Sequence, residues 1–391
     1  MPMQVTIAGG GMIVHDQLLP SFYQLERLGL VDGITVCARH QETLNALMDL
    51  RKHFRPFLKP FAQAFAEMPP RNIAVIALPD HLHFEAIMAA LDADHYVICV
   101  KPLVLTTAHG HAIEKEARSR GLFVGIEYHK RFDDRSLMAR SKYRAGQFGE
   151  FRLGTASLME KWNYRHSNFQ SWFTTENTDA FTYIGCHYVD LVHFITGLLP
   201  TAVSVYGIKD KFPNGNEGFL WTDARVIWNN GACLNVQNSL GYPDDGPGTN
   251  TQGLALYCSI DGKGAMLRHS DQYRGLEYVY TENGATTYAE PSPDYFQYVD
   301  LGGEGLTPVG YGYRSIEHLV RACHRVEAAP DRIRTLNEID AEGILATPAN
   351  NRYNEQVIEA ARRSILNGGS FERTNHEPTT TNANYEHTTA R

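Results

Sequence analysis

Residues 3 to about 150 alternate between short apolar runs and amphipathic stretches, and this alternation restricts the possible folds strongly. Runs rich in Val and Ile occupy residues 4–8, 34–38, 73–78, 95–100 and 122–126. Stretches with helical periodicity lie between them, at residues 18–28, 42–53, 82–91 and 109–120. Short, strongly apolar strands that alternate with helices are typical of a parallel sheet covered on both faces. The first third of the chain is therefore predicted to be a doubly wound α/β domain.

The pattern changes after residue 150, where strand-like runs follow one another with few helical stretches between them. These runs lie at residues 151–158, 202–207, 224–228, 233–238, 254–260 and 277–281. The pairs Asn230-Gly231, Asp261-Gly262 and Asn283-Gly284 punctuate them, and such pairs favour the tight turns of hairpins. We predict an antiparallel sheet of hairpins, followed by helices at residues 311–328 and 351–366.

These patterns divide the chain into three regions. Residues 1–130 are assigned to the parallel α/β domain and residues 131–373 to the second domain. Residues 374–391 are rich in Thr, Asn and His with almost no large apolar side chains, so this segment is predicted to be a disordered tail. Residues 241–253, rich in Gly, Pro, Asp and Asn, are predicted to form a long loop.

Charge and composition argue against several classes of protein. The 391 residues carry 36 Lys and Arg against 44 Asp and Glu, a net charge of −8 that gives no general attraction for nucleic acid or anionic membranes. The apolar runs at residues 73–79 and 96–100 are far shorter than the roughly 20 residues that span a bilayer. Six scattered cysteines without CxxC spacing predict no metal site and no disulfide framework, and favour a cytoplasmic protein.

A glycine-rich turn directly follows the first predicted strand. Residues 9–14 read Gly-Gly-Gly-Met-Ile-Val, so Gly9 and Gly11 match the first two glycines of G-x-G-x-x-G and Val14 replaces the third. The first glycine permits a tight turn, and the second lets the backbone approach a pyrophosphate at a helix N-terminus. The third permits close packing of helix on strand. We expect a dinucleotide to bind here, with Met12 and Ile13 beside it; a glycine turn without a ligand is the alternative.

The end of the second predicted strand bears on which dinucleotide binds. A carboxylate at this position would bind the adenosine ribose of NAD. The sequence instead reads Cys37-Ala38-Arg39-His40, without an acidic residue. Arg39 could accept the 2′-phosphate of NADP or stack on adenine, and it could also be an ordinary solvated arginine beside NAD. NAD and NADP both remain open, with a slight preference for NADP.

Four further motifs occur in order along the chain. They are Leu-Pro-Asp-His-Leu-His at residues 78–83, Val-Ile-Cys-Val-Lys-Pro-Leu at 97–103, Gly-Ile-Glu-Tyr-His-Lys-Arg-Phe at 125–132 and Gly-Cys-His-Tyr-Val-Asp-Leu at 185–191. Together they resemble motifs of the Gfo/Idh/MocA oxidoreductases, NAD(P)-dependent enzymes that act mostly on sugars and cyclitols. The resemblance covers roughly residues 3–370.

This resemblance implies a fold and a set of site residues. The implied fold is an N-terminal Rossmann domain followed by a larger α/β domain with an open, mainly antiparallel sheet, in subunits that pair into a dimer or tetramer. The first motif implies that Leu78, Pro79 and His83 lie beside the nicotinamide ribose. The second implies that Lys101 lies against the cofactor and the reacting hydroxyl, and the fourth that His187 is the active-site histidine.

Each of these residues also has an ordinary structural explanation. Lys101 could be a lysine that extends its amine to solvent from a strand end, and His187 could be a core histidine. An imidazole is suited to take the hydroxyl proton near neutral pH, which favours a catalytic His187 once the motif is considered. Asp190, one helical turn later, is predicted to be a structural partner rather than a participant in the chemistry.

Two positions depart from the family pattern. Val100 stands where the family has the Glu of its E-K-P motif, which removes a carboxylate beside Lys101. Tyr183 stands where the family commonly has an Asp, one turn before His187. Either Tyr183 exchanges a proton, with Lys101 lowering its pKa, or Tyr183 stacks on the substrate while His187 acts alone.

An aromatic and basic stretch between the two halves supplies candidate substrate-binding residues. Trp162, Arg165 and Trp172 lie in this stretch, where aromatic faces suit the C–H surface of a sugar ring and cations suit hydroxyl or acid groups. A surface loop with two core-packing tryptophans is the alternative. His129 and Lys130 lie on the segment that the resemblance places past the nicotinamide.

Three functions are consistent with these features. The first is an oxidoreductase that moves a hydride between NAD or NADP and a secondary hydroxyl of a pyranose, glycoside or cyclitol. The second is an NAD-dependent glycoside hydrolase that works through a transient 3-keto sugar. The third is a non-catalytic sensor that binds a dinucleotide or a sugar.

Overall fold

The first half of the chain forms a six-stranded sheet in which every neighbouring pair of strands is parallel, as predicted. The computed structural model describes residues 1–50, 52–270, 278–289, 294–303 and 305–374. In spatial order the strands are β3 (Arg55–Leu58), β2 (Val31–Ala38), β1 (Met3–Ala8), β4 (Ile73–Ile76), β5 (Tyr96–Val100) and β6 (Val124–Glu127). This 3-2-1-4-5-6 order is that of a dinucleotide-binding Rossmann sheet.

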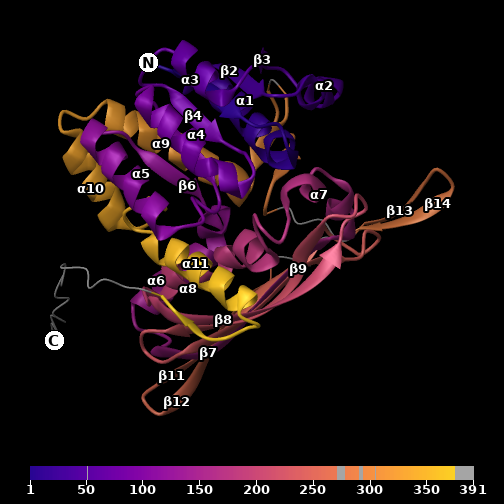
Figure 1. Cartoon of the computed structure of the whole chain (residues 1–391), viewed down its shortest axis with the longest axis vertical. Coiled ribbons are helices and arrows are strands. Elements are labelled where there is room, and N and C mark those ends of the chain that lie inside the picture. The colour runs from indigo at the N-terminus through magenta and orange to yellow at the C-terminus, as the bar shows by residue number, and fades with distance from the viewer. Residues whose placement is uncertain (51, 271–277, 290–293, 304, 375–391) are drawn as a thin grey trace.

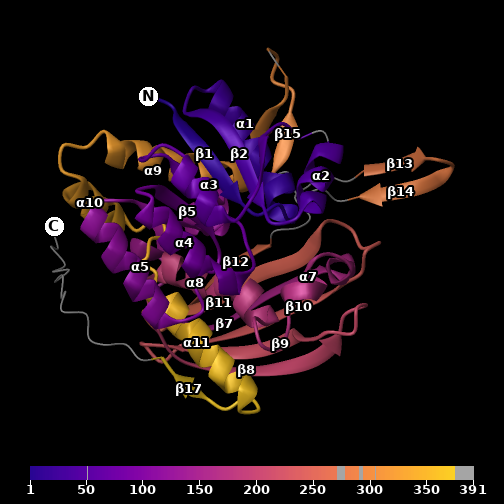
Figure 2. The ribbon, with the colours of Figure 1, turned by 45° about the horizontal axis from the view of Figure 1, so that its top comes forward.

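Helices connect these strands and cover the sheet (Figures 1 and 2). They are the π-helical turn η1 (Val14–Leu18), which continues into α1 (Leu19–Arg27), then α2 (Gln41–Asp49), α3 (Phe61–Glu67), α4 (His83–Asp92) and α5 (Thr107–Arg120). Local residues set the ends of α5: the Thr106 hydroxyl accepts a hydrogen bond from the His109 amide at 3.3 Å, and Gly121 ends the helix at a φ of 62°.

Two elements of this half are absent from the sequence prediction. Strand β3 is an edge strand of four mostly exposed residues that includes Pro56, which only an edge strand tolerates well. Helix α3 has seven residues, of which Ala64 and Phe65 are buried. Both are too short and too irregular in hydropathy to give a clear periodic signal.

The second half contains a seven-stranded sheet in the order β12-β11-β7-β10-β9-β8-β17. Its strands are β7 (Glu150–Lys161), β8 (Pro200–Lys211), β9 (Glu217–Trp228), β10 (Cys233–Tyr242), β11 (Asn250–Ile260), β12 (Lys263–Ser270) and β17 (Glu372–Arg373). All pairs are antiparallel except β7 with β10, so the sheet is mainly antiparallel as predicted. The predicted turns at Asn230-Gly231 and Asp261-Gly262 join β9 to β10 and β11 to β12.

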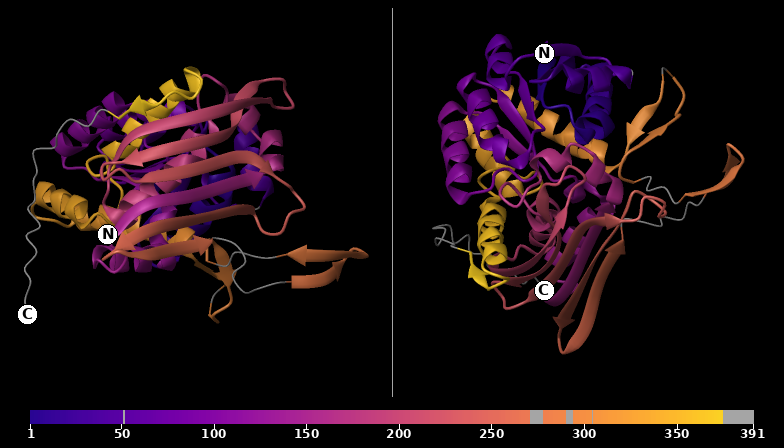
Figure 3. Two further views of the ribbon diagram at one scale, coloured as in Figure 1. Left: turned by 90° about the horizontal axis from the view of Figure 1, so that it is seen from below. Right: turned by 45° about the vertical axis from the view of Figure 1, so that its right-hand side comes forward.

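Several boundaries differ from the prediction. The long loop expected at 241–253 is shorter, because β10 continues to Tyr242 and β11 begins at Asn250. The strand expected at 277–281 is β13 (Tyr278–Glu282), which pairs only with β14 (Ala285–Ala289) in an arm that projects from the body (Figure 3). Thr374 still donates to Pro200 O at 2.8 Å, whereas the rest of the predicted tail lies outside the described residues.

Helices cover one face of the second sheet and leave the other open (Figure 3). The covering elements are η5 (Phe181–Gly185), also a π-helical turn, α8 (Cys186–Thr196) and α11 (Arg352–Leu366), with η3 (His129–Phe132), α6 (Asp134–Arg144), η4 (Trp162–His166) and α7 (Phe169–Trp172) around them. None of the helices in the described part of the chain is long and apolar enough to cross a membrane.

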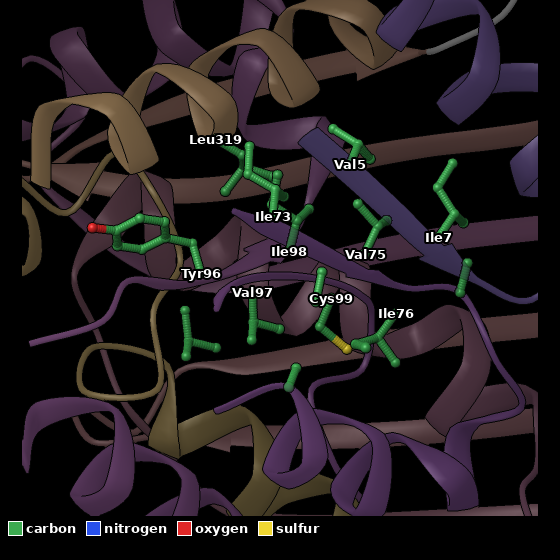
Figure 4. Close-up of a cluster of buried hydrophobic side chains, with 14 of the residues drawn as sticks. Val5, Ile7, Ile73, Val75, Ile76, Tyr96, Val97, Ile98, Cys99 and Leu319 are labelled. Carbon is green, nitrogen blue, oxygen red and sulfur yellow. The ribbon is translucent and has the colours of Figure 1, made fainter. Parts of the chain in front are cut away.

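Two late helices return to the first sheet. Helix α9 (Tyr311–Glu327) places Leu319 in the same buried cluster as Ile73 and Ile98 (Figure 4), and Gly125 on β6 leaves room for it. Helix α10 (Arg332–Glu342) lies beside α5, where Arg118 pairs with Asp340. A short hairpin of β15 (Gln297–Val299) and β16 (Thr307–Val309) precedes α9.

A buried ion pair ties the segment that follows the first sheet to helix α8. Arg131 on η3 donates to the carboxylate of Asp190 on α8 at 2.6 and 2.9 Å, and the Tyr353 hydroxyl of α11 donates to the same carboxylate at 2.9 Å. Arg131 and Asp190 are 2% and 1% exposed. This confirms that Asp190 is a structural partner. The pair holds the segment that leaves the first sheet against α8.

We expect Asp190→Asn to lower the free energy of unfolding by about 3–5 kcal/mol, because it leaves a buried guanidinium without its counter-charge. Urea unfolding followed by circular dichroism measures the loss. The control is Glu338→Gln, which breaks exposed pairs with Arg325 and Arg334 and should cost less than about 1 kcal/mol. Equal losses in the two variants would contradict the assignment.

Candidate active site

A cleft of about 500 Å³ lies at the carboxyl edge of the first sheet, where ligands bind in folds of this kind. The glycine turn after β1 forms one part of its wall, and residues at or after the ends of β2, β3, β4, β5 and β6 form the rest. Residues of α7, with Asn168 before it, and Tyr183 of η5 close the cleft from the second half. Of the predicted residues, those that line the cleft are Gly9, Gly11, Met12, Ile13, Arg39, Leu78, Pro79, Lys101, His129, Trp172 and Tyr183.

The glycine turn leaves backbone exposed to the cleft. Gly9 has a φ of +111°, and a Cβ there would lie 2.1 Å from Ala77 O, so only glycine fits. Gly11 is different, because a Cβ there would meet only Asn168 Nδ2, at 3.7 Å. The protein itself therefore leaves the space above Gly11 open. Amides of the first helical turn lack intrahelical partners and form an anion-binding end.

The helix that follows this turn is widened where the third glycine is missing. Val14 is fully buried at the start of the π-helical turn η1, which also buries Gln17. π-helical turns are rare and concentrate at functional sites. The third glycine of the motif serves the packing of helix on strand, and here the buried Val14 side chain occupies that position.

The end of the cleft beyond β2 is basic. Arg39, His40 and Lys59 line this end. The two carboxylates that line the cleft lie elsewhere: Asp80 follows β4, and Glu127 belongs to β6. Lys59 also lies 3.5 Å from Glu67 in an exposed pair. β2 is followed directly by Arg39 and His40, so no carboxylate stands at the position that would bind the adenosine ribose of NAD.

Lys101 follows β5 and reaches the cleft under Tyr183. Its Nζ donates a hydrogen bond to Tyr183 O and lies 3.5 Å from the centroid of the Tyr183 ring. Asp80, 3% exposed, lies within range of its charge: burial raises the pKa of Asp80, and the positive charges of His83 and Lys101 oppose that rise. The Asp80 carboxyl group thus lies within electrostatic range of Lys101, although Val100 replaces the family glutamate.

His83 has a supporting position rather than a place in the cleft wall. Its side chain is fully buried, with Nδ1 2.8 Å from Pro102 O and Nε2 2.9 Å from Leu78 O. The ring therefore ties the turn after β4 to the segment after Lys101. Because both ring nitrogens of His83 face backbone carbonyl oxygens, this geometry does not present the ring for the expected contact with a cofactor.

Tyr183 lies on the π-helical turn η5, in an aromatic cluster. Its ring packs edge-on against Phe169 and Trp172, with centroids 5.1 and 5.9 Å away. Burial raises the pKa of its phenol well above the usual value, and the nearby Tyr164 and Asp80 raise it further. The Lys101 ammonium lies over the ring face, and the net shift of this pKa is upward rather than downward. Of the two sequence alternatives, the geometry favours Tyr183 as a stacking surface.

His187 lies behind His129, with ring centroids 4.8 Å apart. His187 is 5% exposed and its Nδ1 has no hydrogen-bond partner among the described residues. Burial lowers its pKa well below the usual value, and the charges of Lys101 and His129 lower it further. The field of Lys101 thus reaches His187, but of these two histidines it is His129 that lines the cleft.

Two predicted substrate-binding residues lie elsewhere. The Arg165 guanidinium is buried, 3.8 Å from the centroid of the Trp162 ring, and donates to Asp210 at 2.5 Å and to Leu240 O at 2.7 Å. These contacts make Arg165 and Trp162 part of the packing at the sheet end. Neither lines the cleft. Patterns of residue type could not show this, because the partner Asp210 is 45 positions away.

A polar group on the covered face of the second sheet escaped the sequence analysis. Glu160, at the end of β7, accepts a hydrogen bond from Asn250 Nδ2 at 3.3 Å. Burial raises its pKa, and the charges of Lys101 and Lys130 oppose the rise. Lys130 is buried and donates to Gln252. Alternation along β7 places Glu160 on the same face as Ala156 and Leu158, which is the signal that could have revealed it.

Comparison with known families decides the classification. Residues 3–128 match the family described as "Oxidoreductase family, NAD-binding Rossmann fold", and residues 137–259 match the "GFO/IDH/MocA C-terminal domain". The chain belongs to the Gfo/Idh/MocA family. Its first domain is an NAD-binding Rossmann domain, and the open glycine turn fits such a cofactor.

Individual relatives of this Gfo/Idh/MocA protein are distant. D-glucoside 3-dehydrogenase of Escherichia coli is 24% identical over 52% of this chain and 56% of its own length. The NADP(+)-dependent scyllo-inositol 2-dehydrogenase of Bacillus subtilis is 24% identical over 35% of this chain and 37% of its own. The chain thus spans about half or less of these curated relatives. The solved structure of GenD2 from gentamicin A biosynthesis, in complex with NAD, shares the fold with a TM-score of 0.69, 17% identity and coverage of 96% and 97%.

Alanine substitutions at the two glycines separate folding from cofactor binding. We expect Gly9→Ala to lower the free energy of unfolding by about 3 kcal/mol, from the clash with Ala77 O and the strained φ. Gly11→Ala should change it by less than about 1 kcal/mol and yet weaken NAD(P)H binding, because the methyl group takes the space left for the ligand. Urea unfolding and fluorescence titration measure the two effects. Wild-type affinity in Gly11→Ala would contradict the placement of the cofactor.

Proposed function

We propose that this protein is an NAD(P)-dependent oxidoreductase that acts on a secondary hydroxyl of a pyranose, glycoside or cyclitol. One observation carries the proposal: the Lys101 ammonium and the open glycine turn lie in one cleft. Family membership and the relatives named above support the same class of substrate.

The residues of the cleft divide the work of binding. Gly9, Gly11 and the first helical turn would hold the pyrophosphate, and Leu78 and Pro79 would lie along the nicotinamide half. When bound, the nicotinamide ring accepts or returns a hydride. Tyr183 and Trp172 offer apolar faces that suit the C–H surface of a sugar ring.

Lys101 is placed to handle the reacting hydroxyl. Its ammonium is held by Tyr183 O and by the Tyr183 ring, which fixes where the positive charge lies. A fixed cation next to a hydroxyl stabilises the alkoxide character that develops as a hydride leaves the same carbon. Asp80 lines the same cleft and lies within range of the charge of this cation.

A turnover assay tests the proposal. The protein is incubated with NAD⁺ or NADP⁺ and a panel of methyl and p-nitrophenyl glucosides, glucose, and myo- and scyllo-inositol, and reduced nicotinamide is followed by absorbance. Accumulation of NAD(P)H supports the proposal. Release of p-nitrophenol without accumulation would replace it by the redox-neutral glycoside hydrolase. Cofactor binding without turnover of any panel compound would replace it by the sensor.

We expect Lys101→Met to lower kcat by at least about 100-fold, because the charge at the reacting hydroxyl is lost. The Kd for NAD(P)H should stay within about threefold, since the glycine turn makes the main contacts. Stopped assays with the best panel substrate and fluorescence titration measure the two. Retention of more than a tenth of kcat would remove Lys101 from the chemistry.

We also propose that the cofactor is NADP. Arg39, His40 and Lys59 gather at the end of the cleft beyond β2, where a carboxylate would select NAD. Two of these carry permanent positive charge, which suits a 2′-phosphate.

Titration of the wild type and of Arg39→Ala checks the cofactor choice. We expect the wild type to bind NADPH more tightly than NADH, and Arg39→Ala to weaken NADPH about tenfold or more, the worth of one charged hydrogen bond. NADH binding by the same variant is the internal control and should change little. Tighter binding of NADH than NADPH by the wild type would overturn the proposal.

A further inference from the structure

We propose that His129 is the residue that takes the hydroxyl proton, and that Glu127 is the positioning residue that holds it. This inference rests on the proposed function, because it names the proton acceptor for the same reaction. From the Gly-Ile-Glu-Tyr-His motif, His129 is predicted only as a substrate-binding residue. The structure adds its hydrogen-bond partner, Glu127.

Glu127 and His129 form a hydrogen-bonded carboxylate–imidazole pair at the cleft. Nδ1 of His129 lies 3.1 Å from Oε2 of Glu127. The other oxygen, Oε1, accepts from Gln17 Nε2 at 2.9 Å and from the Ser315 hydroxyl at 2.6 Å. Because Oε1 accepts two hydrogen bonds, we assign Glu127 as a carboxylate, which can only accept, and Nδ1 of His129 then carries the hydrogen that faces Oε2. The remaining nitrogen, Nε2, then presents a lone pair.

The position of this pair separates it from His187. Glu127 is 2% and His129 14% exposed, and both line the cleft that holds Lys101. His187 packs behind His129 and lacks a hydrogen-bond partner at Nδ1 among the described residues. A proton acceptor needs access to the substrate, a fixed tautomer and a partner that stabilises its charged form. His129 has all three.

The proton transfer balances with the oxidation. The O–H bond of the substrate breaks and its proton passes to Nε2 of His129. The C–H electron pair of the same carbon leaves as hydride to the oxidised nicotinamide, and a C=O bond forms. Glu127 then faces an imidazolium, whose charge its carboxylate stabilises. In the reverse direction the imidazolium returns the proton.

Other groups pack around the imidazole and set its electrostatic surroundings. From the second half these are His187 on α8 and the carboxylate of Glu160 on β7, and Lys130 adjoins it in the chain. From the segment that follows the second sheet, the rings of Tyr295 and Tyr311 lie with centroids 5.3 and 5.6 Å away. Glu127 is the group that hydrogen-bonds to it.

Variants of the two histidines test the assignment with the best substrate of the panel. His129→Asn should lower kcat by about 10²–10⁴-fold while the Kd for NAD(P)H stays within about threefold. His187→Asn, the matched control, should lower kcat by less than tenfold. Exogenous imidazole should restore part of the activity of His129→Ala. If His187→Asn lowers kcat more than His129→Asn does, His187 is the proton acceptor and the inference is overturned.

Glu127→Gln tests the positioning role by pH. It keeps the shape of the side chain and removes the charge that stabilises the imidazolium, so the acid limb of kcat/KM should move to lower pH. If the acid limb of kcat/KM stays at the same pH while kcat falls equally at every pH, Glu127 contributes only to packing and the positioning role is overturned.

A nuclear magnetic resonance measurement is independent of turnover. The ¹⁵N shifts of the histidine rings, assigned through His129→Asn, should show His129 with its hydrogen on Nδ1. Hydrogen on Nε2 would overturn the inference even if the protein is active. Absence of any turnover on the panel, with the expected tautomer present, would defeat the proposed function and the base role together. Full activity of His129→Asn would defeat the base role alone.

Discussion

The buried pair of Arg131 and Asp190 is the interaction on which the site depends. One partner ends the segment that leaves the first sheet, and the other lies on α8 of the second half. A charge buried on one element must be matched by a charge on the other, so the two halves have few alternative arrangements. His129 and Lys130 directly precede Arg131, and Tyr183 and His187 precede Asp190. The ion pair therefore aligns both groups of site residues at once.

Two widened helical turns place further residues at this junction. The turn η1 brings Gln17 from the helix of the glycine loop to Glu127, and η5 brings Tyr183 over Lys101. Such turns are uncommon, because their hydrogen-bond geometry is less favourable than that of an α-helix. Tertiary contacts at the cleft stabilise both turns. The hydrogen bond from Gln17 to Glu127 also links the helix after the glycine turn to the pair of Glu127 and His129.

The sequence predicted those features that depend on local pattern. The parallel strands, the glycine turn and the Asn-Gly and Asp-Gly hairpins follow from hydropathy and from backbone freedom at particular residues. The predicted role of Asp190 as a structural partner also agrees with the structure. These features need little information about distant parts of the chain.

Features that depend on distant partners could not be predicted in this way. Arg165 resembles a sugar-binding cation until its partner Asp210 is known. Glu127 has the same residue type as many solvated glutamates, and only Gln17 and Ser315, at distances of 110 and 188 positions along the chain, reveal its role. Tyr183 illustrates the same point, because its phenol chemistry depends on whether Lys101 lies at the hydroxyl or at the ring face.

The return of α9 to the first sheet affects how this protein is made. Leu319 and its buried neighbours on α9 complete a core whose last strand ends about 190 residues earlier, at Glu127. When a ribosome has released only β1 to β6, the part of that sheet which α9 covers is still exposed and apolar. The nucleotide-binding half therefore acquires its finished interior only late in synthesis, after strands β7 to β12 of the second sheet have emerged. A gene fragment that stops at the apparent domain boundary encodes a sheet with part of its cover missing.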